Sequence, residues 1–375
     1  MDLPTKCVLK LIIIREMKGS QMSKLQINPV QKEDILSVIN LSQIEWEKFR
    51  GKRIAVTGAT GLIGKNLIYT LLEADKQYQL GCQILAFVRN KTKAMEVFGT
   101  VEEKTLQIVF QDVTKQVPEE IKADYLVHAA SITTSKVMIE NPVETIMTTV
   151  EGTRNMLDFA ARCKMDGAVY LSSMEAYGMT DGSKTELREE DLGYIDLTNI
   201  RNGYSEGKRM AECLCAAFAS EYQVNVRIAR LAQTFGAGIA KDENRVFAQF
   251  AKSVLKGEDI VLHTKGEKAN CYCYTSDAVA GILILLTKGE NGQAYNVANM
   301  ETFCSIRELA EIFLKFAEEK KCKLRIEIPE NAASLGYAPS SILKLNSEKL
   351  MSLGWKPEKD MYAMAERLLA SMKLD

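Results

Sequence analysis

The feature that most constrains the fold is the segment 53–64, which reads RIAVTGATGLIG. A short β-branched run ends at Thr57 and is followed by glycines 58, 61 and 64, after which apolar residues recur with helical spacing. A strand, a glycine-rich turn and a helix in this order can bind a pyrophosphate through the amides of the turn and the helix N-terminus. The segment predicts dinucleotide binding, with a purely structural glycine turn as the alternative.

Short apolar runs separated by helical patterns continue through the first half of the chain. We expect strands at residues 54–57, 83–88, 106–110, 124–128, 169–171 and 226–228. Strands that alternate with helices are typical of a doubly wound parallel sheet. The predicted fold class is therefore α/β, with a Rossmann-type doubly wound parallel sheet and a smaller, interleaved C-terminal substrate-binding domain.

The domain boundaries are predicted from the same pattern. Residues 1–50 are expected to be an N-terminal leader and a helical extension, because residues 29–50 carry apolar side chains at helical spacing. Residues 51–230 are expected to form the NAD(P)-binding Rossmann domain, with a returning segment near 271–298. Residues 231–270 and 299–375 are assigned to the substrate-binding domain.

Composition excludes several classes of protein. The net charge of −1 on 375 residues gives no broad attraction to nucleic acid or to an anionic membrane. The longest apolar stretch, 278–286, is about half of the ~20 residues that a spanning helix needs. Nine cysteines without a repeating frame and two histidines indicate neither a disulfide framework nor a metal site. We expect reduced thiols in a cytoplasmic protein without nucleic-acid or membrane partners.

Two predicted strand ends bear on the choice of dinucleotide. An acidic residue after the second strand would usually accept hydrogen bonds from the ribose 2′-hydroxyl, but this chain has Arg89, Asn90 and Lys91 there. Two cations suit a 2′-phosphate, so the position favours NADP(H) over NAD(H), with a solvated charge run as the alternative. Asp112, after the third strand, could bind an adenine amino group or cap a turn.

The segment YSEGK at 204–208 is a candidate acid–base pair. In a helix, Tyr204 and Lys208 lie four residues apart on one face. A neighbouring ammonium lowers the pKa of a phenol by favouring phenolate, which would make Tyr204 a usable acid or base near neutral pH. The pair follows a predicted strand that ends in Ser172 and Ser173.

Four motifs together carry a family resemblance: TGATGLIG at 57–64, HAAS at 128–131, SSMEAYG at 172–178 and YSEGK at 204–208. In order and spacing they resemble the extended short-chain dehydrogenase/reductase family, in particular its nucleotide-sugar epimerase/dehydratase group. The resemblance runs from about residue 52 to LNSEKLMSLGWKP at 345–357, and is nearest to NDP-sugar 4,6-dehydratases and UDP-glucuronate decarboxylases. It implies a tightly bound NAD(H) or NADP(H), a nucleotide-diphosphate sugar as substrate, and a homodimer.

The resemblance also implies roles for individual residues. Tyr204 would remove the proton from the sugar C4 hydroxyl, Lys208 would lower the Tyr204 pKa and hold the nicotinamide ribose, and Ser173 would hydrogen-bond the C4 oxygen. The hydride would pass from C4 to the nicotinamide. The residues implied to bind the cofactor are Gly58, Thr60, Gly61, Leu62, Ile63, Gly64, Arg89, Asp112, Val113, Ala129, Ala130, Ser131, Tyr204 and Lys208. The residues implied to bind the substrate are Ser173, Met174, Glu175, Gln233 and Asn270.

Glu175 bears on the reaction that follows C4 oxidation. A ketone at C4 acidifies C5, and family members that eliminate water or CO2 carry a glutamate here, whereas simple 4-epimerases do not. Because alternate residues after a strand end share a face, we expect Ser173 and Glu175 to point the same way, with a surface-facing Glu175 as the alternative. Met174 cannot donate a proton, which argues against a close dTDP-glucose dehydratase.

The C-terminal part departs from the family pattern in two places. Gln233 stands where the family has Asn, and Asn270 stands where the family commonly has an Arg that grips the diphosphate, so Lys265 or Lys268 could substitute. Farther along, Asp277 is predicted to be a helix N-cap. Ser305 and Glu308 are predicted to form a capping box.

The predicted function is an NAD(P)-dependent nucleotide-sugar enzyme that oxidises C4 and then eliminates water or CO2. One alternative is a 4-epimerase or 4-ketoreductase, in which Glu175 only positions the substrate. Another is a non-catalytic dinucleotide-sensing protein, against which Ser173, Tyr204 and Lys208 argue because a sensor needs none of them.

Overall fold

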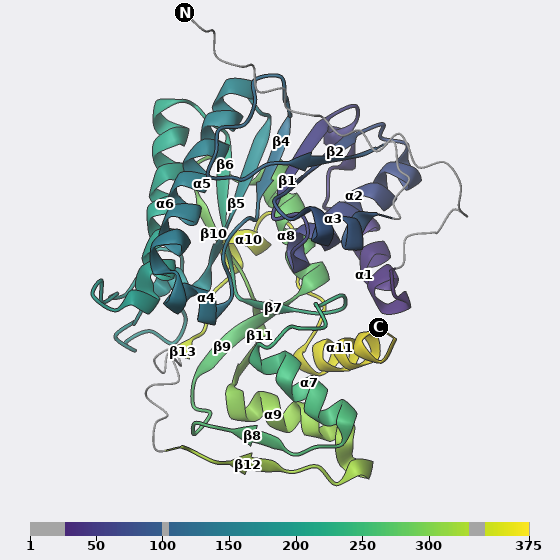
Figure 1. Ribbon diagram of the computed structural model, residues 1–375, viewed down its shortest axis with the longest axis vertical. Coiled ribbons are helices and arrows are strands. Elements are labelled where there is room, and N and C mark those ends of the chain that lie inside the picture. The colour runs from purple at the N-terminus through teal and green to yellow at the C-terminus, as the bar shows by residue number, and fades with distance from the viewer. Residues whose placement is uncertain (1–26, 100–104, 330–341, 375) are drawn as a thin grey trace, which may run out of the picture.

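A seven-stranded, all-parallel sheet organises the larger half of the protein (Figure 1). The computed structural model describes residues 27–99, 105–329 and 342–374, so the predicted leader at 1–26 lies outside the described residues. The strand order is β10-β6-β5-β4-β1-β2-β3. The strands are β1 (Arg53–Thr57), β2 (Gln83–Val88), β3 (Leu106–Phe110), β4 (Tyr125–His128), β5 (Gly167–Ser173), β6 (Val226–Leu231) and β10 (Ala294–Val297). All six predicted strands are confirmed, and the order reverses between β1 and β4, where such sheets bind ligands.

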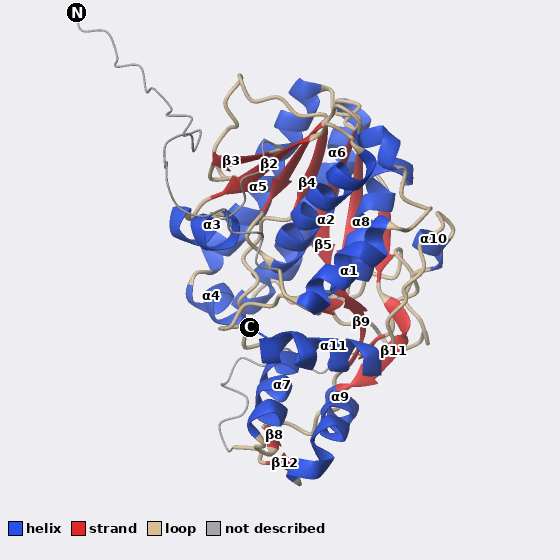
Figure 2. Cartoon of the chain, turned by 90° about the vertical axis from the view of Figure 1, so that its right-hand side faces the viewer, coloured by secondary structure: helices blue, strands red, loops and turns tan. Residues whose placement is uncertain are grey.

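Helices cover both faces of this sheet, which confirms the doubly wound fold (Figures 1 and 2). One face carries α1 (Pro29–Ile39), α2 (Leu62–Tyr78), α3 (Lys91–Phe98) and α8 (Thr275–Lys288). The other carries α5 (Pro142–Cys163) and α6 (Gly203–Glu221), and the short α4 (Ser135–Glu140) packs beside α5. In β1, Ile54 and Val56 belong to the first apolar core, whereas Ala55 belongs to the second. The alternation of a strand therefore separates the two cores.

The C-terminal half is built on a second, smaller sheet, with its own apolar core (Figure 2). Its central strand β9 (Ala269–Tyr274) pairs with β7 (Gln233–Phe235), β11 (Asn299–Ser305) and β13 (Ile342–Leu343). A separate ribbon joins β8 (Ile260–Leu262) to β12 (Leu324–Ile326). The helices are α7 (Val246–Lys256), α9 (Ile306–Leu314) and α11 (Met361–Leu374), whereas the short α10 (Glu348–Met351) packs against β10 of the large sheet. The chain returns to the large sheet through α8 and β10, so the two halves are interleaved.

Local predictions have mixed outcomes. The helical extension is present as α1 and the 3-10 helix η1 (Trp46–Phe49), whose apolar side chains are buried. The capping box of Ser305 and Glu308 is confirmed. Asp277 is not an N-cap, because α8 begins two residues earlier with Tyr274 as its N-cap. The buried Asp277 carboxylate instead accepts a hydrogen bond from the Lys359 backbone, which fixes the C-terminal segment.

Within the described ranges, no helix is both long and apolar enough to cross a lipid bilayer.

Candidate active site

The glycine turn lies at the C-terminal end of β1, next to the end of β4. Gly58 has a φ of +61°, and a Cβ placed on it would lie 2.7 Å from the Ala129 carbonyl carbon. A Cβ on Gly64 would lie 2.4 Å from the Gly58 oxygen. Only glycine allows this approach, which aims the first turn of α2 at the crevice where the strand order reverses.

Residues that follow β4 form the wall of the crevice next to the glycine turn. The Thr57 hydroxyl accepts hydrogen bonds from the Ala129 and Ala130 amides at 3.1 Å, and pairs with His128 Nδ1 at 2.7 Å. Burial, with a contribution from the Lys208 charge, lowers the His128 pKa to about 3, so the imidazole is neutral and is not a general base. The Ser131 hydroxyl is buried without a hydrogen-bond partner among the described residues. A glycine cradle facing an unsatisfied hydroxyl fits a dinucleotide.

Arg89 and Asp112 lie near each other beyond the ends of β2 and β3. Asp112 accepts hydrogen bonds from the Thr114 amide and hydroxyl, both at 2.9 Å, and therefore caps a turn. Burial alone would raise the Asp112 pKa, but the bonds from Thr114 and the Arg89 charge lower it. The exposed Arg89 is free to face solvent or a ligand, and the NADP(H) preference stays a prediction.

The end of β5 and the start of α6 bring the predicted catalytic residues together. Tyr204, in the first turn of α6, is buried with 7% of its surface exposed, and the Ser173 side chain lies near enough to lower its pKa. Lys208 Nζ donates to the Leu171 carbonyl at 2.7 Å and lies 5.7 Å from the Tyr204 ring centroid. The strand thus holds the ammonium beside the phenol.

The acid–base balance of this group differs from the prediction. The Tyr204 pKa is raised, chiefly by burial and then by the Glu175 charge, while Ser173 and Arg201 lower it. The prediction that the Tyr204 pKa is lowered is therefore wrong for the protein by itself. The cost of burying a phenolate outweighs the attraction of the nearby cations. Burial also lowers the Lys208 pKa to about 8.

Glu175 does face Tyr204, but the reason differs from strand alternation. The chain turns into the 3-10 helix η2 (Met174–Tyr177), with Ser173 as its N-cap accepting from the Glu175 amide at 3.2 Å. This turn directs the Glu175 carboxylate toward the start of α6, where Ser205 Oγ lies 3.4 Å from it.

Sequence reasoning missed the partner of Glu175. Arg201, in the 3-10 helix η3 (Ile200–Asn202), contacts both carboxylate oxygens at 3.1 Å, and its side chain is only 12% exposed. The Lys268 side chain also interacts with Glu175 and Arg201, and burial lowers the Lys268 pKa. The signal in the sequence that could have identified this partner is the position of Arg201, a basic residue three positions before Tyr204.

The predicted substrate residues are spread over both halves. Met174 is buried beside Glu175, Gln233 is half-buried at the start of β7, and Asn270 is buried on β9. Of the two lysines suggested as substitutes for the family arginine, Lys268 faces the Glu175 carboxylate and Lys265 is exposed.

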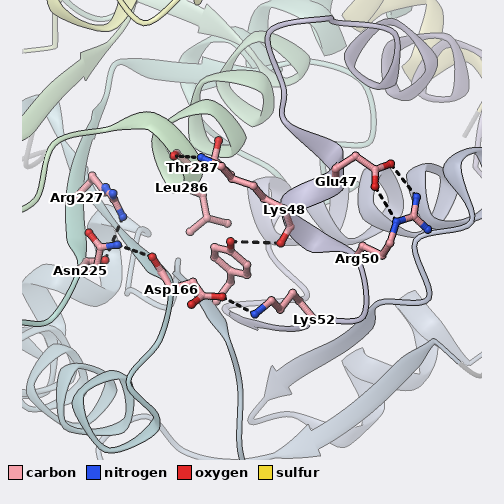
Figure 3. A pocket seen from close by; sticks show the side chains of 10 residues that line it. Glu47, Lys48, Arg50, Lys52, Asp166, Asn225, Arg227, Leu286 and Thr287 are labelled. Atoms are coloured by element: carbon pink, nitrogen blue, oxygen red, sulfur yellow. Dashed lines mark hydrogen bonds and ion pairs between the residues drawn. The ribbon is translucent and has the colours of Figure 1, made fainter.

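A cavity of about 510 Å³ lies at the opposite edge of the sheet, where the strands begin (Figure 3). Its charged groups already pair with one another, Arg50 with Glu47 and Lys52 with Asp166, each at 2.7 Å. The cavity contains none of the predicted site residues and forms the joint between the N-terminal extension and the sheet. Its lining residues are Glu47, Lys48, Arg50, Lys52, Tyr125, Asp166, Asn225, Arg227, Leu286 and Thr287.

Fold and site together define a dinucleotide-binding type of α/β fold with a buried tyrosine beside a lysine at its candidate site. The sequence model of the NAD dependent epimerase/dehydratase family matches residues 54–298, and the chain belongs to this family. NAD is the cofactor of this family, and its binding by the glycine turn stays a prediction.

Known relatives and solved structures agree with this family. UDP-glucuronic acid decarboxylase 6 from Arabidopsis thaliana is 30% identical over 82% of this chain and 84% of its own length. An epimerase from Methanothermobacter thermautotrophicus has a TM-score of 0.73 at 20% identity, covering 88% of this chain and 94% of that one. A dTDP-glucose 4,6-dehydratase from Streptomyces venezuelae, solved with NAD, has a TM-score of 0.69 at 21% identity, covering 86% and 97%. The solved structures support the fold.

Proposed function

We propose that the protein oxidises C4 of a nucleotide-diphosphate sugar that carries a carboxylate at C5, and then promotes loss of CO2. The observation that carries this proposal is the Glu175 carboxylate, which pairs with Arg201 near Tyr204 and lies within range of the Lys268 charge. Two relatives of this chain are named UDP-glucuronic acid decarboxylase, and their names describe a reaction of this kind. This similarity supports the proposal.

In the first step Tyr204 takes the proton of the C4 hydroxyl, and Ser173 hydrogen-bonds the same oxygen. Bound NAD would supply the acceptor for the C4 hydride and a positive charge near the C4 oxygen. The hydrogen bond to Leu171 holds Lys208 in place, so the ammonium is positioned before substrate arrives. Because burial and Glu175 raise the Tyr204 pKa, proton removal depends on the nearby cations.

In the second step the C4 ketone stabilises the electron pair left at C5 when the C5–C6 bond breaks, and C5 then takes a proton in place of the departed CO2. CO2 departs without needing a proton, whereas loss of water from C6 needs a proton donor for the leaving hydroxyl. The buried Met174 thioether beside Glu175 cannot supply one. Arg201 and Lys268 carry two positive charges against the one negative charge of Glu175, so a second carboxylate, from the sugar, is compatible with the site.

The test is turnover of UDP-, GDP-, CDP- and dTDP-sugars, neutral and uronic, with product masses. Loss of the mass of CO2 from a uronic acid supports the proposal. Loss of water from a neutral sugar indicates a 4,6-dehydratase, an unchanged mass with altered chromatography indicates epimerisation, and bound NAD without turnover indicates a sensor. Each of these three outcomes overturns it.

The Glu175→Gln variant identifies the role of the carboxylate. We expect it to form the 4-keto sugar but to yield the decarboxylated product at least ~100-fold more slowly, because the group that manages the C5 proton is lost. Glu206→Gln is the matched control: this glutamate lies in the first turn of α6, two residues after Tyr204, and pairs with Arg209. Equal rates of product formation by both variants would contradict a role for Glu175.

We further propose that the chain forms a homodimer through α5 and α6, which lie side by side (Figure 1). Val143 and Met147 of α5 and Met210 of α6 are exposed by 63%, 39% and 50%. Phe218, also on α6, is buried in the chain's own core. A monomeric mass in solution would contradict the dimer.

A further inference from the structure

The helix α1 lies outside the segment that the family model matches, and it contacts both halves of the protein (Figure 2). Its apolar residues Ile35, Val38 and Ile39 are buried in the core shared with α2 and α8. Its polar residues Gln31 and Asp34 are also buried, with 4% and 6% of their surface exposed. Buried polar groups require partners, and those of α1 lie in both halves.

Asp34 connects α1 to the C-terminal half. One carboxylate oxygen accepts a hydrogen bond from the Tyr274 hydroxyl at 2.7 Å, and the other accepts from Arg367 Nε of α11 at 2.8 Å. Arg367 also donates to the Val30 carbonyl at 3.0 Å. At the N-cap of α1, Asn28 donates to Ser371 of α11 at 2.8 Å. These hydrogen bonds join α1 and its N-cap to the end of β9 and to α11.

Gln31 connects the same helix to the dinucleotide turn. Its amide donates to Asn66 Oδ1 at 2.8 Å, and Asn66 in turn donates to the Leu62 carbonyl in the first turn of α2. Gln31 also packs on the loop 236–239, where a Cβ on Gly238 would lie 2.7 Å from its amide nitrogen. From the other side, Lys65 of α2 donates to the Gly238 carbonyl at 2.8 Å.

We propose that α1 is an interdomain strap, in which Gln31 and Asp34 hold the loop 236–239 and α11 against the first turn of α2 and thereby slow the release of NAD. The first turn of α2 is where the pyrophosphate of a dinucleotide binds. Any movement of the C-terminal half away from α2 opens this region to solvent, and the strap opposes that movement. Gln31 and Asp34 are positioning residues, because they act through α2 and the loop.

The test is the rate at which full-length protein releases NADH, followed by fluorescence after dilution or after addition of excess NAD. We expect Asp34→Asn to release NADH about tenfold faster, since one charge-assisted contact between the halves is lost. Glu33→Gln is the matched control: Glu33 is the adjacent residue and also contacts Arg367, at 3.2 Å, but its side chain is 68% exposed. The control should release NADH like the unchanged protein.

A purely structural role predicts a different result. It would lower the thermal transition of Asp34→Asn in the NAD-free state while leaving the release rate of the folded protein unchanged, and that outcome overturns the proposal. Should Asp34→Asn fail to fold, Gln31→Ala decides in the same way, because it removes the bond to Asn66 and leaves the ion pair intact. The inference rests on the family's cofactor and not on decarboxylation, so NADH release is informative whatever the sugar substrate.

Discussion

Two neighbouring serines at the end of β5 have different surroundings. Ser172 is 4% exposed, and its hydroxyl donates to Glu212 Oε1 at 2.5 Å. Ser173 is partly exposed, and as the N-cap of η2 it accepts from the Glu175 amide at 3.2 Å. Two residues of identical chemistry thus belong to the core and to the candidate site, because Ser173 is the last residue of β5, where the chain turns into η2.

Each serine adjoins a Glu–Arg pair, and these pairs differ in burial. Arg230 binds Glu212 at 2.7 Å with side-chain exposures of 5% and 9%, and joins β6 to α6. Arg201 binds Glu175 at 3.1 Å with exposures of 12% and 32%. The first pair is closed to solvent, whereas the second is open enough to exchange a partner for a ligand. The two pairs have the same residue types, so their burial is what distinguishes the structural pair from the pair in the candidate site.

The largest expected effect is on stability. Glu212→Gln should lower the free energy of unfolding by about 3–5 kcal/mol, because it leaves the Arg230 charge buried without its partner. Glu175→Gln should lower it by no more than about 1 kcal/mol, because solvent screens the more open pair. Urea denaturation of both variants measures the difference, and equal losses would contradict the comparison.

Substitutions of the two serines should affect different properties of the protein, turnover in one case and stability in the other. Ser173→Ala should reduce turnover about 100-fold with little change in stability, because it removes the hydrogen bond that we propose for the reacting oxygen. Ser172→Ala should lower the free energy of unfolding by roughly 1–3 kcal/mol and leave the chemical step nearly unchanged. Steady-state rates and thermal transitions on the same samples check both, and a larger rate loss in Ser172→Ala would reverse the assignment.

The smallest effect is on pH dependence. Burial lowers the Lys208 pKa to about 8, so its ammonium is lost as pH rises through that value, and turnover should fall. Between about pH 8 and 10.5 the unfolded chain binds more protons at this residue than the folded protein does, so the free energy of unfolding rises with pH there. Lys208→Arg keeps a charge at all these values, and its alkaline limb should move to higher pH. If the alkaline limb of the profile of turnover against pH does not move in Lys208→Arg, then a group other than Lys208 causes it.

The local patterns predicted much of this protein. The glycine turn, the six strands and the spacing of Tyr204 and Lys208 are all short-range signals, and the structure shows the strands where they were expected. The direction of Glu175 was predicted for the wrong reason, because η2 replaces strand alternation at that point. Asp277 was misassigned because its backbone partner, Lys359, is remote in sequence.

The sequence by itself determined the glycine turn, the positions of six strands and the spacing of Tyr204 and Lys208, because each depends on neighbours within one turn or one strand. Only the tertiary structure decided the order of the strands, that Arg201 pairs with Glu175, that burial raises the Tyr204 pKa, and that α1 links α2 to α11. Such properties depend on desolvation and on contacts between distant segments, and no local pattern encodes either one.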